Sequence, residues 1–157
     1  MKNTDLFSNV AIGVLIITII IVGIFKFVLK NDSTDFDIND IKEVVIKNMD
    51  GEDINLSELI NSNFDTYMLI LEINNCPPCV FKGIEDLKSL KKAGKVCFVI
   101  VVHEWLEEVK GWRQNYEFSP FYILSKNEFY DSFNVAHLPA IIKIEDGKIR
   151  NVRYITN

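Results

Sequence analysis

The stretch that constrains the fold most runs from residue 67 to residue 90, where an apolar segment passes directly into a helical pattern. YMLILEI (67–73) is a continuous apolar run, as expected for a central strand that is buried on both faces. NNCPPC follows it, and apolar residues then recur at helical spacing with lysines and acidic residues between them. A buried strand that leads into a helix is typical of an open α/β sheet, where sites form at the carboxyl ends of the strands.

The chain after residue 40 repeats this alternation of strand and helix. Two Asp-Gly pairs, at 50–51 and 146–147, predict the turns of two hairpins, one at each end of the pattern. Strands that alternate with helices predict a parallel sheet with helices on both faces. In chain order the predicted elements are a hairpin that begins with IKEVVI (41–46), the short helix LSELIN (56–61), the strand YMLILEI (67–73), a helix after the cysteines, the strand VCFVIVV (96–102), the helix EWLEEVKGWRQNY (104–116), the strand FYIL (121–124), the helix KNEFYDSFNV (126–135) and a hairpin in AIIKIEDGKIRNVRYI (140–155).

The amino-terminal 30 residues carry a different signal. There is no charged residue from Leu6 to Phe25, and an apolar run of this length can cross a bilayer about 30 Å thick as a helix of roughly 20 residues. A cleaved signal peptide would need small residues at the cleavage site, but KFVLKNDSTD follows the run without an A-x-A pattern. We therefore predict an uncleaved membrane anchor over residues 1–30, with a single transmembrane helix at about 6–29.

Charge separates the anchor from the rest of the chain. Residues 31–40 are polar and acidic and are predicted to be a linker, and residues 41–157 are predicted to form one domain. The net charge is −5, and because the first 30 residues carry three Lys and one Asp, the remainder carries −7. Such a chain has no basic surface for phosphates, which argues against a nucleic-acid binder. The lysines on the two sides of the apolar run do not assign an orientation.

The two cysteines of CPPC are placed for redox chemistry. Cys76 opens the predicted helix, where the positive end of the helix dipole and the free N–H groups favour a thiolate. Pro77 fits the first turn, because its missing N–H would be unpaired there in any case. Cys79 lies one turn further on, near enough to close a disulfide, and its N–H is free to hold the Cys76 thiolate. This is the layout of an exchange-active dithiol, with an exposed nucleophile and a resolving partner behind it.

Other uses of the cysteine pair remain open at this point. A structural zinc site normally needs four ligands, but the other candidate ligands are only Cys97, His103 and His137. A Cu(I) site built from the pair and one histidine is chemically reasonable, since soft thiolates suit Cu(I). A purely structural disulfide would close so short a loop that it constrains the unfolded chain little. Cys97 lies inside an apolar strand and is predicted to pack as a small buried hydrophobe.

A second motif lies far from CPPC in the sequence. Leu138-Pro139 stands just before a predicted strand, where proline is tolerated at the first residue. The hairpin with its Asp-Gly turn, the apolar strand leading into CxxC at a helix start, and V-x-x-x-P followed by a strand and EDGKI together resemble the thioredoxin fold. The closest resemblance, over about residues 41–157, is to the membrane-tethered thiol-disulfide oxidoreductases of the TlpA and ResA kind. It implies a central mixed sheet flanked by helices, with an amino-terminal β-hairpin extension.

The resemblance also implies roles for particular residues. Cys76 matches the attacking cysteine, Cys79 the resolving cysteine, and Pro139 the family's cis-proline, which lies against the disulfide. The implied activity is exchange with disulfides or thiols of exported proteins, more often as a reductase that is fed by a membrane electron-relay protein, with no bound cofactor. The implied topology places the amino terminus in the cytoplasm and the domain on the extracytoplasmic (periplasmic) side.

The sequence departs from this family at two positions. The family usually has an aromatic residue, most often Trp, before the first cysteine, and here that residue is Asn75. A buried acid often lies six residues before that cysteine, and here the position holds Ile70. Residues two apart in a strand share a face, so Glu72 lies on the Ile70 side and one step closer to the thiols. We predict that Glu72 accepts the proton of Cys79.

Functions of another class fit the same residues. An extracytoplasmic Cu(I) chaperone would present Cys76 and Cys79 together with His137 or His103. The resemblance implies that His137, two residues before Pro139, lies near the thiols. A non-catalytic adaptor on a thioredoxin fold is also compatible with the sequence.

Overall fold

The computed structural model describes residues 43–60, 64–133, 135–146 and 148–156. The predicted membrane anchor, its transmembrane helix and the predicted linker all fall outside these ranges. Within the described ranges, no helix is both long enough and apolar enough to cross a bilayer.

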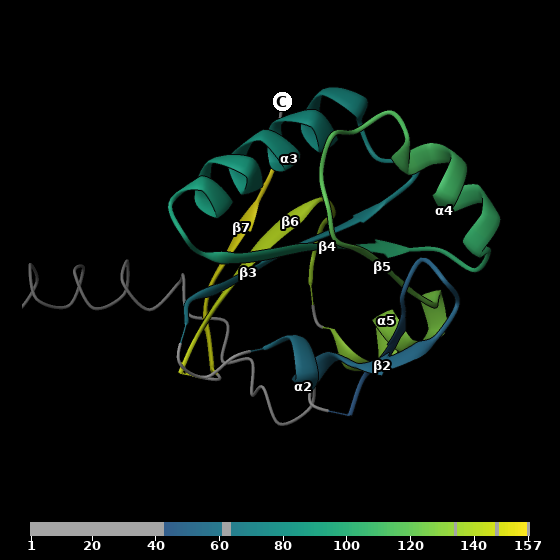
Figure 1. Ribbon diagram of the computed structural model, residues 1–157, viewed down its shortest axis with the longest axis horizontal. Coiled ribbons are helices and arrows are strands. Elements are labelled where there is room, and N and C mark those ends of the chain that lie inside the picture. The colour runs from purple at the N-terminus through teal and green to yellow at the C-terminus, as the bar shows by residue number, and fades with distance from the viewer. Residues whose placement is uncertain (1–42, 61–63, 134, 147, 157) are drawn as a thin grey trace, which may run out of the picture. The chain divides into compact units, whose positions relative to one another are not determined.

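A mixed sheet forms the centre of the described part, with helices on both of its faces (Figure 1). The strands follow one another across the sheet in the order β2-β1-β5-β4-β3-β6-β7. The element order is the one predicted from the sequence, and the bounds of the FYIL strand are those predicted. The strands are β1 (Val45–Lys47), β2 (Asp53–Asn55), β3 (Thr66–Glu72), β4 (Val96–Val102), β5 (Phe121–Leu124), β6 (Ala140–Glu145) and β7 (Lys148–Tyr154), and the helices are α2 (Leu56–Leu59), α3 (Pro77–Lys92), α4 (Leu106–Arg113) and α5 (Lys126–Ser132).

The sheet is parallel only in its middle. Strand β4 runs parallel to β3 on one side and to β5 on the other. Strand β1 pairs antiparallel with both β2 and β5, and β6 pairs antiparallel with both β3 and β7. The parallel sheet predicted from the strand and helix alternation is therefore wrong at both ends, because β1 and β6 take their direction from pairing with β5 and β3, which are distant in the chain. The mixed sheet that the resemblance implied is confirmed.

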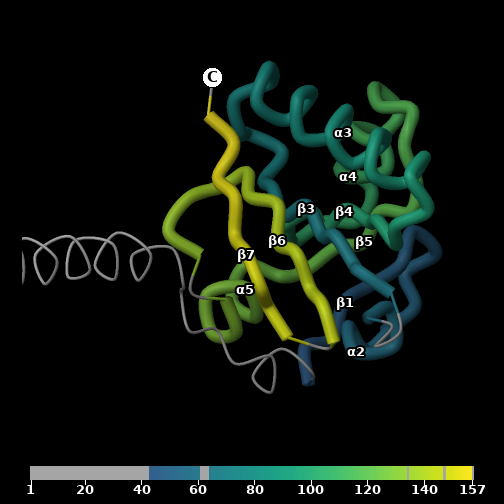
Figure 2. The backbone as a smooth tube through the Cα atoms, turned by 90° about the vertical axis from the view of Figure 1, so that its left-hand side faces the viewer, coloured from purple at the N-terminus to yellow at the C-terminus, as the bar shows by residue number. Residues whose placement is uncertain are grey.

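Two hydrophobic clusters fill the space between the sheet and its helices. Figure 1 shows α3 and α4 over one face and α2 and α5 over the other, and Figure 2 shows the β6–β7 hairpin at one edge in yellow. Leu69 and Leu71 of β3 pack in the cluster that contains α3, whereas Met68 and Ile70 pack in the cluster that contains Phe129 of α5. The side chains of β3 thus alternate between two covered faces, which explains its unbroken apolar sequence.

Helix α3 lies very close to the sheet where Gly83 faces it. A β-carbon added at Gly83 would lie 2.6 Å from Cδ1 of Ile155 and 3.1 Å from Cδ1 of Leu69. Both of these side chains are buried, so they have little room to move aside. Gly83 therefore sets how deeply α3 packs, and it does so one turn after Cys79.

We expect Gly83→Ala to lower the free energy of unfolding by roughly 1–3 kcal/mol, because the added methyl group overpacks the contact with Ile155. Gly111 in α4 is the matched control, since a β-carbon there would have no neighbour within 4 Å. Gly111→Ala should raise the free energy of unfolding by up to about 1 kcal/mol through helix propensity. Denaturant unfolding of both variants measures the difference, and equal stability of the two would contradict the close packing of α3.

Candidate redox site

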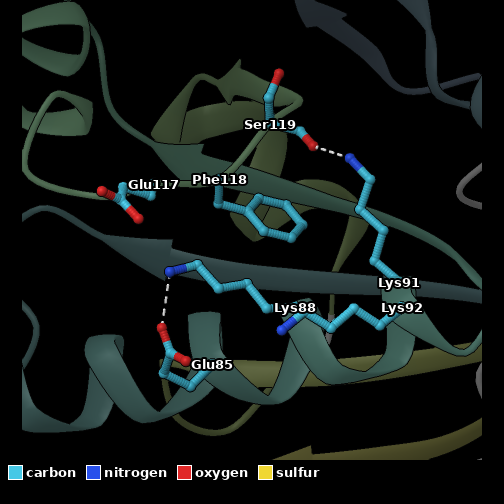
Figure 3. Close-up of a pocket in the computed structure, with 7 residues that line it drawn as sticks. All are labelled: Glu85, Lys88, Lys91, Lys92, Glu117, Phe118 and Ser119. Carbon is cyan, nitrogen blue, oxygen red and sulfur yellow. Dashed lines mark hydrogen bonds and ion pairs between the residues drawn. The ribbon is translucent and has the colours of Figure 1, made fainter.

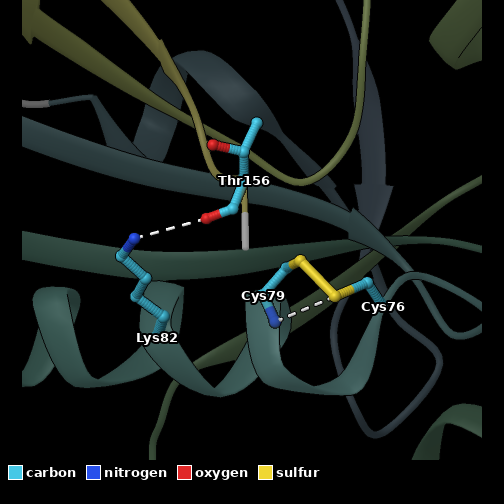
Figure 4. The surroundings of a disulfide bond; sticks show 4 residues. All are labelled: Cys76, Cys79, Lys82 and Thr156. Atoms are coloured by element: carbon cyan, nitrogen blue, oxygen red, sulfur yellow. Dashed lines mark hydrogen bonds between the residues drawn. A yellow bond between two sulfur atoms is a disulfide. The ribbon is translucent and has the colours of Figure 1, made fainter.

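Cys76 and Cys79 form a disulfide at the start of α3, with their Cα atoms 5.2 Å apart (Figure 4). Cys76 is exposed, whereas Cys79 is only 5% exposed and packs in the cluster with Leu69 and Leu71. The predicted arrangement of one exposed and one sheltered cysteine is therefore present in the oxidised pair.

The helix start is organised around the Cys76 sulfur. Cys76 is the N-cap of α3, and its Sγ accepts a hydrogen bond from the N–H of Cys79 at 3.3 Å. Pro77 and Pro78 occupy the first two helical positions and have no N–H, so Cys79 supplies the first amide proton of the helix. After reduction, this N–H and the helix dipole both favour a thiolate at Cys76.

The turn that precedes Cys76 is closed by Asn75. The Asn75 Oδ1 accepts a hydrogen bond from the N–H of Glu72 at 2.7 Å. The N–H of Asn75 donates in turn to the Glu72 carbonyl at 3.0 Å. The resemblance to the oxidoreductase family identified this position only as a missing aromatic residue. The sequence signal that could have identified Asn75 is the tendency of Asn side chains to hydrogen-bond to nearby main-chain groups in turns.

Pro139 reaches the same edge of the sheet as the dithiol. Strand β6 pairs with β3 so that Ala140 lies opposite Ile70, which places Pro139 beside the carboxyl end of β3. Pro139 is buried, and the cis isomer predicted for the Leu138–Pro139 bond is confirmed. The Pro139 carbonyl accepts a hydrogen bond from the N–H of Ile155 at 2.9 Å.

The end of the chain connects the proline segment to α3. Ile155 packs in the cluster that contains Cys79 and lies against Gly83. The next residue, Thr156, accepts a hydrogen bond through its carbonyl oxygen from Lys82 Nζ at 3.3 Å, as Figure 4 shows beside the disulfide. Residues 155 and 156 thus join Pro139 to the helix that carries both cysteines.

Glu72 is the last residue of β3 and is half-buried. It continues the row of Ile70, which packs in the cluster on the α5 side, whereas Cys79 packs in the cluster on the α3 side. In the described part of the chain, the Glu72 carboxylate makes no hydrogen bond to Cys79. The structure brings the two residues to the same end of β3 without a hydrogen bond between their side chains, so the role of Glu72 stays a prediction.

The two histidines make other contacts. His103 Nδ1 accepts the N–H of Trp105 at 3.1 Å, and Nε2 lies 3.2 Å from Oε2 of Glu108, so His103 orders the connection between β4 and α4. His137 packs edge-on against the ring of Tyr154. Among the residues that the structure describes, no three His, Cys, Asp or Glu side chains gather as a metal-binding group. The ligand set expected for Cu(I) is therefore not assembled there.

Cys97 is buried, as predicted, and stays apart from the dithiol. It lies opposite Tyr67 near the amino end of β3, whereas the dithiol follows the carboxyl end of that strand. Burial raises the pKa of the Cys97 thiol to about 11. The thiol is therefore neutral at physiological pH and unreactive as a nucleophile.

A hollow of about 750 Å³ lies between α3 and the segment before β5 (Figure 3). Two of its lysines are engaged with near neighbours. Lys88 Nζ bonds to Oε1 of Glu85 at 2.8 Å, and Lys91 Nζ bonds to the Ser119 carbonyl at 2.5 Å and lies over the ring of Phe118. The cysteines do not line this hollow.

If Glu72 accepts the Cys79 proton, Glu72→Gln will slow the attack of Cys79 on a mixed disulfide. The reduced protein is mixed with a small aromatic disulfide that releases one coloured thiol when Cys76 attacks and a second when Cys79 resolves the adduct. We expect the second phase to slow by roughly a hundredfold, the lower end of what a positioned base contributes, while the first phase is unchanged. Glu107→Gln, at an exposed carboxylate in α4, is the control, and an unchanged second phase in both variants would assign proton removal to water.

No family model matches the chain, and no curated protein matches it in sequence. Solved structures do resemble it. An uncharacterized thioredoxin-like protein from Porphyromonas gingivalis is 22% identical, with a TM-score of 0.56 over 71% of this chain and 78% of that one. MTB dsbF is 16% identical, with a TM-score of 0.60 over 75% and 89% of the two chains. BsSco, a member of the Sco family of cytochrome c oxidase assembly proteins, is 16% identical, with a TM-score of 0.58 over 80% and 88%.

These likenesses concern the fold, since every identity is low. The solved structures that resemble the chain include thiol-disulfide oxidoreductases. The described part of this protein has a thioredoxin-like α/β fold, with a mixed sheet, helices on both faces and a CxxC disulfide at the start of α3.

Proposed function

We propose that this protein is a thiol-disulfide oxidoreductase that exchanges its Cys76–Cys79 pair with disulfides of partner proteins. One observation carries the proposal above the others. The sulfur of the exposed residue Cys76 accepts the first available N–H of a 16-residue helix, at 3.3 Å, while its partner Cys79 is sheltered in the core. The two cysteines therefore lie in different environments. This difference suits Cys76 to attack on the partner disulfide and Cys79 to resolution of the mixed disulfide.

The exchange proceeds in two balanced steps. The Cys76 thiolate attacks one sulfur of the partner disulfide, so a mixed disulfide forms and the partner's other sulfur leaves as a thiolate. Cys79 then loses its proton to Glu72 or to water and attacks the Cys76 sulfur. The Cys76–Cys79 disulfide forms, and the second partner sulfur leaves as a thiolate. The partner disulfide gains two electrons and leaves as two thiolates, which take up protons from solvent, while Cys76 and Cys79 lose two electrons as their disulfide forms.

The proposal places this domain outside the cytoplasm. The uncharged run within residues 6–29 would hold the chain in the bilayer, and the acidic linker at 31–40 would separate the domain from the membrane surface. Exported proteins with disulfides are then the partners, and a membrane electron-relay protein returns two electrons to the Cys76–Cys79 disulfide after each cycle. The support for this setting is the sequence, together with the resemblance to tethered oxidoreductases.

We expect Cys79→Ser to trap partner proteins on Cys76, because the mixed disulfide can no longer be resolved from within. Cells that produce the full-length variant are quenched with acid, alkylated and separated under non-reducing conditions, and the adducts should disappear when a reductant is added. The double variant Cys76→Ser/Cys79→Ser should trap nothing. An absence of adducts with Cys79→Ser at normal expression would count against exchange as the function.

The direction of exchange is measurable as the reduction potential of the pair. The full chain is equilibrated in dithiothreitol or glutathione buffers, alkylated and weighed by mass spectrometry. We expect a value near or below about −250 mV, in the range of thioredoxin and suited to a reductase. A value near about −120 mV, typical of strong disulfide donors, would reverse the proposed direction while leaving exchange itself in place.

A further inference from the structure

We propose that Asn75 is a positioning residue for the dithiol: its side-chain amide closes the turn after β3 and thereby holds the Cys76 sulfur at the Cys79 N–H. The relevance of this positioning to exchange rests on the proposed function. The hydrogen bonds of Asn75 themselves do not depend on which partner the protein has.

Two hydrogen bonds tie Asn75 to the end of β3. Its Oδ1 accepts the Glu72 N–H at 2.7 Å, and its own N–H donates to the Glu72 carbonyl at 3.0 Å. Only Ile73 and Asn74 lie between the two bonded residues, so the connection is short and closed. Glu72 belongs to a strand that is paired on both sides. The closed turn therefore fixes the position of Cys76 relative to the sheet.

The helix start makes Cys76 unusually dependent on this placement. A helix usually offers several free N–H groups at its amino end, but Pro77 and Pro78 remove the first two. Of the amides in the first turn, that of Cys79 is the one bonded to the Cys76 sulfur. A thiolate that relies on one donor loses much of its stabilisation when the donor distance changes, since hydrogen bonds weaken steeply with distance and angle.

A relative with Trp at this position cannot use this device, because an indole ring has no hydrogen-bond acceptor. Asn75 is half-buried, whereas its neighbour Asn74 is exposed. The two asparagines therefore form a matched pair, alike in chemistry and adjacent in the chain but different in contacts.

The test compares Asn75→Ala, Asn75→Ser and Asn74→Ala in the reduced full chain. The rate of Cys76 alkylation by iodoacetamide is followed as a function of pH, with the modified cysteine identified by peptide mass. We expect the pH of half-maximal rate to rise in Asn75→Ala, and a rise of one whole pH unit would slow alkylation by about tenfold at any pH well below both midpoints. Asn75→Ser keeps a short acceptor and should fall between Asn75→Ala and the unchanged protein. Asn74→Ala should match the unchanged protein.

Thermal unfolding separates positioning from a general loss of stability. If Asn75→Ala lowers the melting temperature but its pH profile matches that of Asn74→Ala, the proposed role of Asn75 is overturned. If Asn75→Ala does not fold, Asn75→Ser decides by the same comparison. The pH profile needs no partner protein, so a displaced profile without trapped adducts would leave this inference standing and refute exchange. Trapped adducts with an unchanged pH profile would support exchange and overturn the proposed role of Asn75.

Discussion

The pairing of β3 with its two neighbours is the constraint on which the rest of the structure depends. Strand β3 is in register with β4 along its full length and with β6 from Thr66 to Ile70, and its central residues are completely buried on both faces. The dithiol follows the carboxyl end of β3 in sequence, whereas Pro139 arrives there through the register with β6. A slip of one residue would turn every β3 side chain to the opposite face and would move Pro139 relative to the cysteines. The relative positions of the dithiol and Pro139 are thus set by sheet pairing rather than by contacts between the side chains of the site.

The depth of α3 is the second determinant of the site. Gly83 lets the helix approach the sheet until Ile155 fills the remaining space, and the same Ile155 donates its N–H to the Pro139 carbonyl. One buried residue from the end of the chain therefore fixes the helix with the cysteines and the proline segment relative to each other. This arrangement shelters Cys79, and it leaves Cys76 exposed at the helix start.

The sequence predicted the local features of this fold better than the non-local ones. Continuous apolar runs identified β3, β4 and β5, and the prolines identified the start of α3. These features depend on residues that are neighbours in the sequence, so the sequence pattern shows them directly. The directions of β1 and β6 depend on partners distant in the chain, so the alternation of strands and helices predicted them wrongly. The same limit applies to Asn75, whose bond to Glu72 becomes evident only once the end of β3 is fixed. The cis bond at Ser119–Pro120 had no distinguishing signal in the sequence.

The two cysteines of the pair lie in different environments. Cys76 is exposed and has a hydrogen-bond donor, which favours its charged form after reduction. Cys79 is surrounded by aliphatic side chains such as Leu71, and burial in such surroundings favours the neutral thiol. Since Ile70 occupies the position where the resembling family often has an acid, the interior of the sheet offers no carboxylate there. Under the proposed function, the Cys79 proton is therefore expected to pass to Glu72, at the carboxyl end of β3, or to solvent.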